Sequence, residues 1–172
     1  MDVTDMINYN IDLLNHNDLG GSFFHLDRND PTVGFSYDAS SFAGHTYPAT
    51  SAQPISPPSS TPTSPQTLDA DMLHMRLLLG SHLAQHLRHQ LEEHKGYTST
   101  AGVSTNKLLS KLVGSVNKPK GQTTLVPPYE ATDGSESNVT KFMDDHEIGK
   151  VPGIGFKSAQ KIRQYILQRQ PI

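Results

Sequence analysis

The chain has 172 residues, of which 34% are hydrophobic, below the roughly 45–50% of an ordinary globular domain, so we expect part of it to remain unpacked. It contains no cysteine, which excludes disulfides, thiolate metal sites and cysteine nucleophiles, and no apolar run reaches the roughly 18 residues of a membrane helix, so we expect no membrane contact. The net charge of −3 divides unevenly, because residues 1–75 hold one basic and nine acidic residues whereas residues 76–172 hold thirteen basic and eight acidic residues.

Lysines are concentrated in the middle of the basic half. Five lysines and no acidic residue lie between Glu93 and Glu130. A stretch of one charge sign in an otherwise acidic protein indicates an anionic partner, such as a phosphate group or a nucleic acid. A lysine-rich surface that contacts only water would give the same count, and charge alone favours neither interpretation.

The N-terminal segment is predicted to form a short strand, a helix and then two strands. We expect residues 2–4 to be extended and Thr4 to cap the helix. Residues 22–26 and 32–37 are predicted as strands because they flank the turn-forming sequence Asp27-Arg-Asn-Asp-Pro31. The apolar side of the helix would consist of Met6, Ile7, Ile11 and Leu14.

A proline-rich segment follows, from about residue 38 to residue 66. It holds six prolines among serine, threonine and alanine residues. Such a composition does not bury enough apolar surface to offset the entropy that the chain loses on ordering. We therefore expect a long disordered insert that interrupts a domain.

A long helix is predicted from about Asp69 to Lys95. We expect Asp69 to be its N-cap and Gly96 to follow its last turn, where glycine is common. Gly80 costs about 1 kcal/mol relative to alanine inside a helix, which indicates a close backbone contact there. The apolar stripe of this helix consists of Leu73, Leu77, Gly80, Leu83, Ala84, Leu87 and Leu91.

The remaining elements alternate at first and are then only helical. This order indicates an α/β unit followed by a small helical unit. The predicted elements are a strand at 97–103, a helix at 105–116 capped by Ser104, a strand at 122–126, and two helices at 139–147 and 157–168.

The strongest local signal is the sequence Ile148-Gly-Lys-Val-Pro-Gly-Ile-Gly-Phe-Lys-Ser-Ala159. Without side chains, the backbone N–H groups of Gly153 and Gly155 can approach a phosphate closely, and the next helix presents its positive end to the same anion. Ile154 would fill the gap between the helices, while Lys150 and Lys157 add positive charge. The pattern is typical of a helix-hairpin-helix that binds a nucleic-acid backbone; the alternative is a helix turn without a ligand.

A second signal is the sequence from Gly102 to Thr123, in which lysines recur at Lys107, Lys111 and Lys118. A strand ends, a helix begins, and we expect the free N–H groups of the helix start and the ammonium groups to converge on one edge of a sheet. Such an arrangement suits a triphosphate or a nucleic-acid backbone. Spacing alone favours the alternative, an amphipathic helix with solvated lysines.

Three histidines, His82, His86 and His89, share one face of the predicted long helix, and His74 lies further back. Spacings of four and three residues can place imidazoles around one metal ion. A histidine-rich face in contact with water is commoner, and no carboxylate stands at a matching position, so we do not expect a zinc site.

These segments resemble the Y-family (UmuC-type) translesion DNA polymerases. Residues 101–113 and 117–123 are similar to the palm signature of that family, and residues 151–159 are similar to its thumb hairpin. The segments that look closest to the iota branch of the family are residues 2–6, 44–47 and 73–81.

The resemblance implies an incomplete α/β palm of the ferredoxin-like α+β type over residues 1–128, with the insert at about 38–66, and the start of an all-α thumb over residues 129–172. It implies two-metal nucleotidyl transfer with Mg²⁺ or Mn²⁺ on a DNA primer-template, and a nuclear location. Lys118 would contact the incoming dNTP. The residues implied to contact DNA are Lys107, Lys111 (on the primer side), Lys150, Gly153, Ile154, Gly155 and Lys157.

One feature of the family is not matched. Its metal-binding Asp-Glu pair lies just before the strand that residues 2–4 would continue, and this sequence starts at Met1, past that position. Asp2 and Asp5 are not expected to substitute, because a shift of a few residues along a strand moves a carboxylate by many ångströms. We therefore expect no catalytic residue and no metal ligand in this polypeptide, and no polymerisation by it alone.

Two other functions are weighed beside this one. The chain could be a non-catalytic DNA-binding module that uses the turn at Gly153 and Gly155 together with the lysines. It could also be an unrelated repair enzyme with such a hairpin, for example a base-excision glycosylase. Enzymes of that class usually carry a catalytic aspartate after the hairpin, and no acidic residue follows Glu147 in this sequence.

Overall fold

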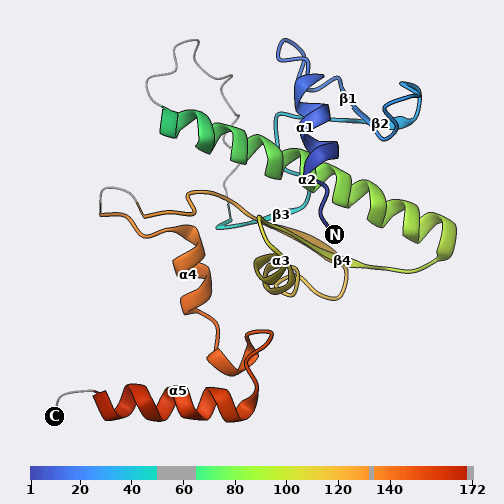
Figure 1. The fold of residues 1–172 in the computed structure, drawn as a ribbon. Helices are drawn as coiled ribbons and strands as arrows, with labels where there is room; N and C mark the ends of the chain where they lie inside the picture. The colour runs from blue at the N-terminus through green and yellow to red at the C-terminus, as the bar shows by residue number, and fades with distance from the viewer. Residues whose placement is uncertain (50–64, 132–133, 170–172) are drawn as a thin grey trace.

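The computed structural model describes residues 1–49, 65–131 and 134–169. Within these ranges the chain forms five α-helices, one 3₁₀ helix and two small sheets (Figure 1). In chain order the elements are α1 (Thr4–Asp12), β1 (Ser22–His25), β2 (Gly34–Tyr37), β3 (His45–Tyr47), α2 (Pro65–Lys95), β4 (Thr100–Val103), α3 (Lys107–Val113), β5 (Gly121–Leu125), α4 (Asn138–Asp144), η1 (Ile148–Lys150) and α5 (Phe156–Arg169).

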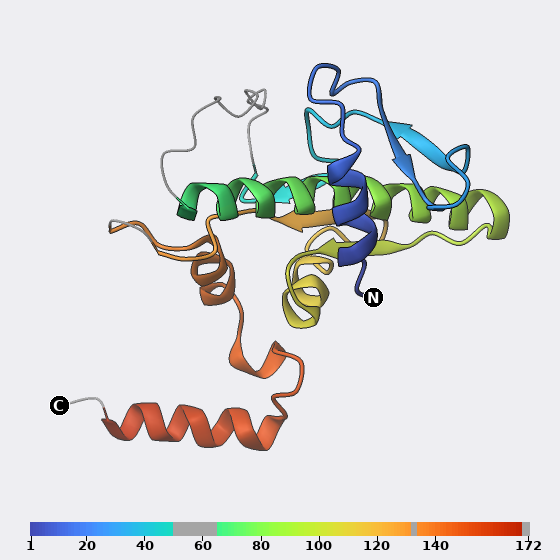
Figure 2. The same cartoon turned by 45° about the horizontal axis from the view of Figure 1, so that its top comes forward.

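The larger sheet has three parallel strands in the order β3-β5-β4. The middle strand, β5, is buried from Gln122 to Leu125, as expected for a parallel strand that is covered on both faces. Figure 2 shows α2 along one face of this sheet and α3 against the other. The predicted mixed α/β class is therefore confirmed.

A first hydrophobic core joins α1 and the antiparallel β1–β2 hairpin to α2. Asn10 links α1 to this hairpin: its amide nitrogen donates to the carbonyl oxygen of His25 at 2.9 Å, and its amide oxygen accepts from the N–H of His25 at 2.7 Å. Asn10 is 2% exposed, and these hydrogen bonds fix the position of α1 along β1. The core residues are Ile7, Ile11, Leu14, Phe24, Tyr37, Ala39, Leu78, Leu79 and Leu83.

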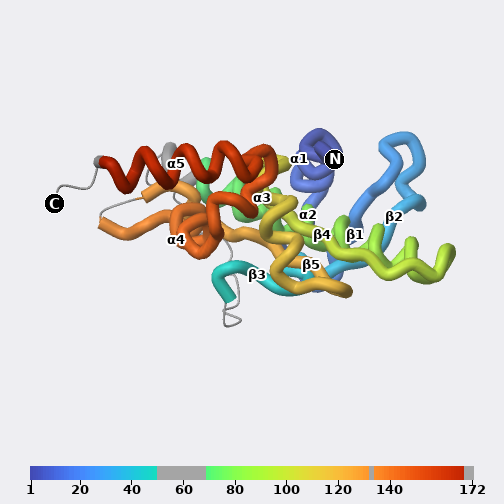
Figure 3. Tube along the Cα trace, turned by 90° about the horizontal axis from the view of Figure 1, so that it is seen from below, coloured from blue at the N-terminus to red at the C-terminus, as the bar shows by residue number. Residues whose placement is uncertain are grey.

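A second core lies between α3, β5 and α4, and it consists of Leu109, Leu112, Val113, Leu125 and Phe142. The side-chain nitrogen of Asn138, the first residue of α4, donates to the carbonyl oxygens that follow β5, at 3.0 Å and 2.8 Å. Helix α5 lies beyond η1, at the end of the molecule away from α2 (Figure 1), and Figure 3 views the molecule from that end.

The start of α1 differs from the prediction. Residues 2–4 do not form a strand, and Thr4 is the first residue of α1 rather than its cap. The carboxylate of Asp2 instead accepts hydrogen bonds from the amide of Thr4 at 3.0 Å and from its hydroxyl at 2.6 Å. This local turn engages donors that an extended strand would offer to a neighbouring strand.

The start of α3 also differs from the prediction that Ser104 is its cap. The hydroxyl of Ser104 lies 3.1 Å from the hydroxyl of Tyr129 and is engaged there. Asn106 takes the cap position with an extended backbone, and its side-chain oxygen accepts from the amide of Leu109 at 2.9 Å.

Helix α2 ends where the sequence predicts and starts earlier. It begins at Pro65, so the predicted cap Asp69 lies inside the helix. Gly96 follows the last turn with a φ of 70° and confirms the predicted end. A Cβ atom at Gly80 would lie 3.3 Å from a side-chain carbon of Val103, so the close contact expected with backbone is made with a side chain. Over the described residues, no helix combines the length and apolar character needed to cross a bilayer.

Residues 38–49 contradict the prediction of a disordered insert. They include β3, which pairs with β5, and the buried residues Ala39 and Ala43. The N–H of Ala39 donates to the carbonyl of Leu19 at 2.8 Å, and the N–H of Ala43 donates to the hydroxyl of Ser81 at 2.9 Å. Because these bonds satisfy backbone groups, the segment packs although it carries few large apolar side chains. Residues 50–64 of the predicted insert lie outside the described residues.

Candidate nucleic-acid interface

The turn between η1 and α5 is exposed and open. Gly153 has a φ of 92°, a left-handed conformation that favours glycine. Among the described residues, nothing lies within 4 Å of a Cβ atom placed at Gly153 or Gly155. By helix geometry, the first amide groups of α5 lack intrahelical partners and point out of the helix start beside this turn.

Small residues allow α5 to lie close to η1. Ala159 is 3% exposed, and a Cβ atom placed at Gly149 would lie 3.9 Å from the Cβ of Ala159. The N–H of Ala159 donates to the carbonyl of Gly155 at 2.9 Å, and the N–H of the half-buried Ile154 donates to the carbonyl of Val151 at 3.0 Å. These contacts hold the turn from its inner side and leave its outer side open.

Lys150 and Lys157 flank this turn, and both are exposed. The ammonium group of Lys150 lies 3.8 Å from the carboxylate of Glu147, and the two side chains are 73% and 67% exposed. An ion pair this exposed contributes little to stability, so Lys150 can exchange Glu147 for another anion. Lys150 is the last residue of η1. The helix predicted at 139–147 is shorter in the structure, where it forms α4 and is followed by this 3₁₀ helix.

Gly102 brings strand β4 against helix α3. A Cβ atom at Gly102 would lie 1.9 Å from the carbonyl oxygen of Ser110 and 2.5 Å from the nitrogen of Gly114, so only glycine fits this position. Helix α3 carries Lys107 and Lys111 one turn apart, and both side chains are exposed.

Lys118 lies at the opposite end of the sheet from Lys107. The strands β4 and β5 are parallel, Lys107 follows the carboxyl end of β4, and Lys118 precedes the amino end of β5. The hydroxyl of Thr100, at the start of β4, donates to the carbonyl of Pro119 at 2.8 Å, in agreement with this placement. The expected convergence of the lysines on one sheet edge is therefore wrong for Lys118. A helix that joins two parallel strands runs back across the sheet and separates its two connecting loops.

The residues of α2 that hold the Lys118 loop belong to no motif in the sequence. Lys120 forms an ion pair with Glu92 of α2, and Gln122 accepts a hydrogen bond from Arg88 at 3.2 Å. These partners are 28 and 34 residues apart in sequence, so only the fold brings them together. The one local signal is the spacing of Arg88 and Glu92, which places both on the same face of a helix.

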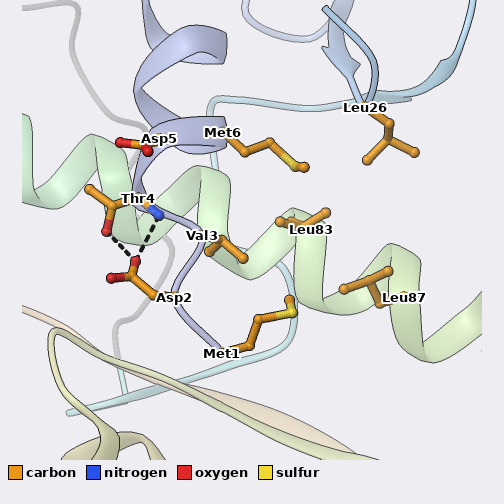
Figure 4. A pocket seen from close by; sticks show the side chains of 9 residues that line it. All are labelled: Met1, Asp2, Val3, Thr4, Asp5, Met6, Leu26, Leu83 and Leu87. Atoms are coloured by element: carbon orange, nitrogen blue, oxygen red, sulfur yellow. Dashed lines mark hydrogen bonds between the residues drawn. The ribbon is translucent and has the colours of Figure 1, made fainter.

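The described residues do not fit a two-metal centre. Within residues 1–49, 65–131 and 134–169, no three His, Cys, Asp or Glu side chains are grouped to hold a metal ion. The carboxylate of Asp2 is engaged by Thr4, whose hydrogen bonds lower the pKa of Asp2. Figure 4 shows the side chains of Asp2 and Asp5 on either side of Thr4 rather than paired.

Three histidines of α2, His74, His82 and His86, pack against aromatic rings, and no metal-binding group of side chains occurs among the described residues. The Nε2 atom of His82 lies 2.8 Å from the carbonyl oxygen of Ser41, and its ring centroid is 4.9 Å from that of Tyr37. The ring of His86 stacks on Phe35 with centroids 4.1 Å apart. Burial is the main cause that lowers the pKa of His82 and of His86, which favours neutral imidazoles in the fold.

A hollow of about 670 Å³ lies between the N-terminus and α2. Figure 4 shows apolar side chains from α1, the end of β1 and α2 facing one another across it. No residue predicted to contact phosphate lines this hollow, so it is separate from the candidate interface. The apolar residues that line it are Met1, Val3, Met6, Leu26, Leu83 and Leu87.

Comparisons with known proteins agree on one family. The sequence model described as the impB/mucB/samB family matches residues 2–115. Human DNA polymerase iota is 42% identical over 90 residues, which cover 52% of this chain and 11% of that protein. DNA polymerase iota of Drosophila melanogaster is 37% identical over 116 residues, which cover 67% of this chain and 13% of that protein.

A bacterial protein also matches. DNA polymerase IV of Staphylococcus saprophyticus is 38% identical over 87 residues, which cover 51% of this chain and 22% of that protein. The matched region therefore spans 11% to 22% of the length of these relatives. The turn at Gly153 and Gly155 lies outside residues 2–115, so the family match does not include it.

Proposed function

The chain belongs to the impB/mucB/samB family, the Y-family translesion DNA polymerases, and from this membership we propose that it forms part of the palm and the start of the thumb of such an enzyme. The reaction is the template-directed addition of a dNTP opposite a damaged base. Residues 1–128 belong to a ferredoxin-like palm, of which the β3-β5-β4 sheet is one part. Residues 129–172 begin the thumb.

The observation that carries this proposal is that every lysine and glycine proposed to contact a phosphate group is exposed. If these lysines and the glycine turn were buried in the protein interior, they would be unable to bind a polynucleotide. The side chains or backbones concerned are exposed at Lys107, Lys111, Lys118, Lys150, Gly153, Gly155 and Lys157.

Within the palm part, Lys118 binds the triphosphate of the incoming nucleotide. A lysine ammonium group acts on phosphate as a point charge that needs no planar partner. Lys107 and Lys111 lie on α3, away from that loop, and bind the DNA backbone, Lys111 on the primer side. The separation of the two groups by the parallel sheet suits two different phosphate ligands better than one.

Within the thumb part, η1, the turn and α5 act as a helix-hairpin-helix on the duplex backbone. The open amides at Gly153 and Gly155 and the start of α5 accept a phosphate, and Lys150 and Lys157 supply charge. Ile154 holds the turn from within. Such contacts read no base edge, so binding is independent of sequence.

The triphosphate assignment is tested with Lys118→Ala. Calorimetry with inorganic triphosphate should show an affinity about tenfold lower, because a hydrogen bond to a charged group contributes about 1.5 kcal/mol. Lys141→Ala is the matched control, since Lys141 is an exposed lysine of α4 with no assigned contact. Equal affinities for the two variants would contradict the assignment.

The hairpin assignment is tested with Gly153→Ala and Gly155→Ala on two duplexes of unrelated sequence. Both variants should weaken binding to both duplexes alike, and Lys157→Ala should lower the salt dependence by about one counterion. Gly134→Ala is the control for backbone strain, because Gly134 has a φ of 83° and open space around it. The assignment fails if Gly153→Ala binds as well as Gly134→Ala.

The chemistry of the whole family depends on divalent metal ions, which activate the primer hydroxyl and stabilise the leaving pyrophosphate. Since the described residues do not fit such a centre, we propose that a polypeptide of residues 1–172 binds substrates without extending a primer. Primer extension with Mg²⁺ or Mn²⁺ would refute this proposal. The alternative, a non-catalytic DNA-binding module, is favoured only if duplex binding persists while triphosphate binding is absent.

The similarity to DNA polymerase iota of human and fly also supports our proposal that this protein is located in the nucleus. A fluorescent fusion of the chain in a eukaryotic cell tests it directly. Exclusion of that fusion from the nucleus would contradict the proposal.

A further inference from the structure

The loop that carries Lys118 is fastened on both sides of that residue. The side-chain nitrogen of Asn117 donates to the hydroxyl of Thr123 at 2.7 Å, and the hydroxyl of Thr100 donates to the carbonyl of Pro119 at 2.8 Å. Lys120 forms an ion pair with Glu92 on α2. Lys118 stands between these contacts with its side chain exposed.

The helix that supplies Glu92 is itself tied to the sheet one turn earlier. The Nε atom of Arg88 donates to the carbonyl of Ser99 at 3.0 Å, and its Nη1 atom donates to the side-chain oxygen of Gln122 at 3.2 Å. Gln122 is 1% exposed, and its side-chain nitrogen donates to the carbonyls of Ala43 and Ser81 at 2.9 Å and 2.8 Å. Glu92 therefore extends from a fixed base, and a group bound to it is held in place relative to β5.

We propose that Glu92 and Lys120 are a positioning pair for Lys118, and that Lys118 alone of the two lysines in the loop binds the triphosphate. This proposal rests on the proposed function of Lys118. Lys120 is paired with the carboxylate of Glu92, whereas no ion pair of Lys118 occurs among the described residues. The hydrogen bond from Lys120 lowers the pKa of Glu92, so the pair stays ionised at neutral pH.

The rival interpretation treats Glu92 as an acid that merely competes with the ligand for Lys120. In that case, replacing Glu92 with a lysine would remove a repulsive charge, release Lys120 and strengthen triphosphate binding. A positioning role predicts the opposite sign, because the loop loses one of its anchors although the site becomes more positive. The sign of the change therefore separates the two interpretations.

The test is a charge reversal with inorganic triphosphate as the probe. Glu92→Lys and Lys120→Glu should each weaken binding by about threefold or more, as expected from losing an exposed ion pair that orders a loop. The double variant restores the pair in reverse and should recover affinity to within about twofold. Glu93→Lys is the matched control, since it adds the same charge at an exposed neighbouring residue and should not weaken binding.

A second measurement needs no ligand. Amide hydrogen exchange of residues 117–121 should be faster in each single variant than in the unchanged chain and should return to its original rate in the double variant. Stronger binding by Glu92→Lys, or a double variant that recovers neither affinity nor exchange protection, overturns the positioning pair. If Lys118→Ala leaves triphosphate binding unchanged while exchange follows the expected pattern, the proposed function of Lys118 fails and the pair still anchors the loop.

Discussion

Replacing Gly102 with alanine tests the packing of β4 against α3, which positions Lys107 and Lys111. The added Cβ atom would lie 1.9 Å from the carbonyl oxygen of Ser110, whereas real Cβ contacts do not fall below 3.0 Å. Helix α3 would have to move by about 1.1 Å, the difference between these two distances. The nearest atoms all belong to the backbone of α3 and Gly114, so no side-chain rotation relieves the clash.

The size of the effect follows from what α3 buries. Its residues Leu109, Leu112 and Val113 are 7%, 5% and 0% exposed and are three of the five residues of the second core. Overpacking a close-packed core costs about 1–3 kcal/mol, and a clash between two backbones belongs at the upper end of that range. We expect Gly102→Ala to lower the free energy of unfolding by about 3 kcal/mol.

Urea denaturation followed by circular dichroism measures this change. With a slope of about 2 kcal/mol per molar urea, the midpoint should fall by about 1.5 M. Gly20→Ala is the control, because a Cβ atom at Gly20 meets nothing within 4 Å among the described residues, and its midpoint should stay within about 0.25 M. The close approach of β4 and α3 is refuted if the two variants unfold at the same urea concentration.

Three further predictions concern stability. Burial lowers the pKa of His82 and His86 below the ordinary value of 6.5, so the unfolded state binds protons first on acidification. The urea midpoint should therefore fall as the pH drops below about 6.5 and stay level just above it; a rise on acidification would contradict this. Asn106→Ala removes the cap of α3 and should cost about 1 kcal/mol, whereas Ser104→Ala should cost less if Asn106 is the cap. Gln122→Leu removes the buried amide group that donates to the carbonyls of Ala43 and Ser81, and it should cost about 1–3 kcal/mol. An unchanged midpoint would contradict a stabilising role of these hydrogen bonds.

The helices and strands follow from the sequence wherever one local pattern decides them. The long apolar stripe of α2 and the glycine after it predict both the helix and its end, because burial of one face and a left-handed glycine are local requirements. Helix starts are predicted less well. Ser104 and Asn106 are both suitable caps, and the choice depends on Tyr129, 25 residues away, which engages the hydroxyl of Ser104.

In the candidate site, too, features that depend on nearby residues are predictable from the sequence, and features that depend on distant residues are less so. The exposure of the glycine turn and the presence of a strand, a helix and a second strand from Gly102 onward follow from local spacing. The position of Lys118 relative to Lys107 depends on the parallel pairing of β4 and β5, which the strand–helix–strand order indicates but the spacing of the lysines does not. The pairing of Lys120 with Glu92 is likewise invisible in sequence, since it requires the end of α2 to lie beside the start of β5.

The two proposed contact surfaces are attached to the molecule in different ways. The Lys118 loop is fixed between β4, β5 and α2, and Gln122 below it is buried in the sheet. The turn at Gly153 is joined to the sheet along the chain through α4, which packs Phe142 into the second core, and through η1, against which α5 rests at Ala159. A triphosphate presents a compact charge that requires a fixed ammonium group, whereas a duplex backbone offers a repeating row of phosphates that a less tightly held turn can follow. The difference in attachment therefore matches the two ligands that the two surfaces are proposed to bind.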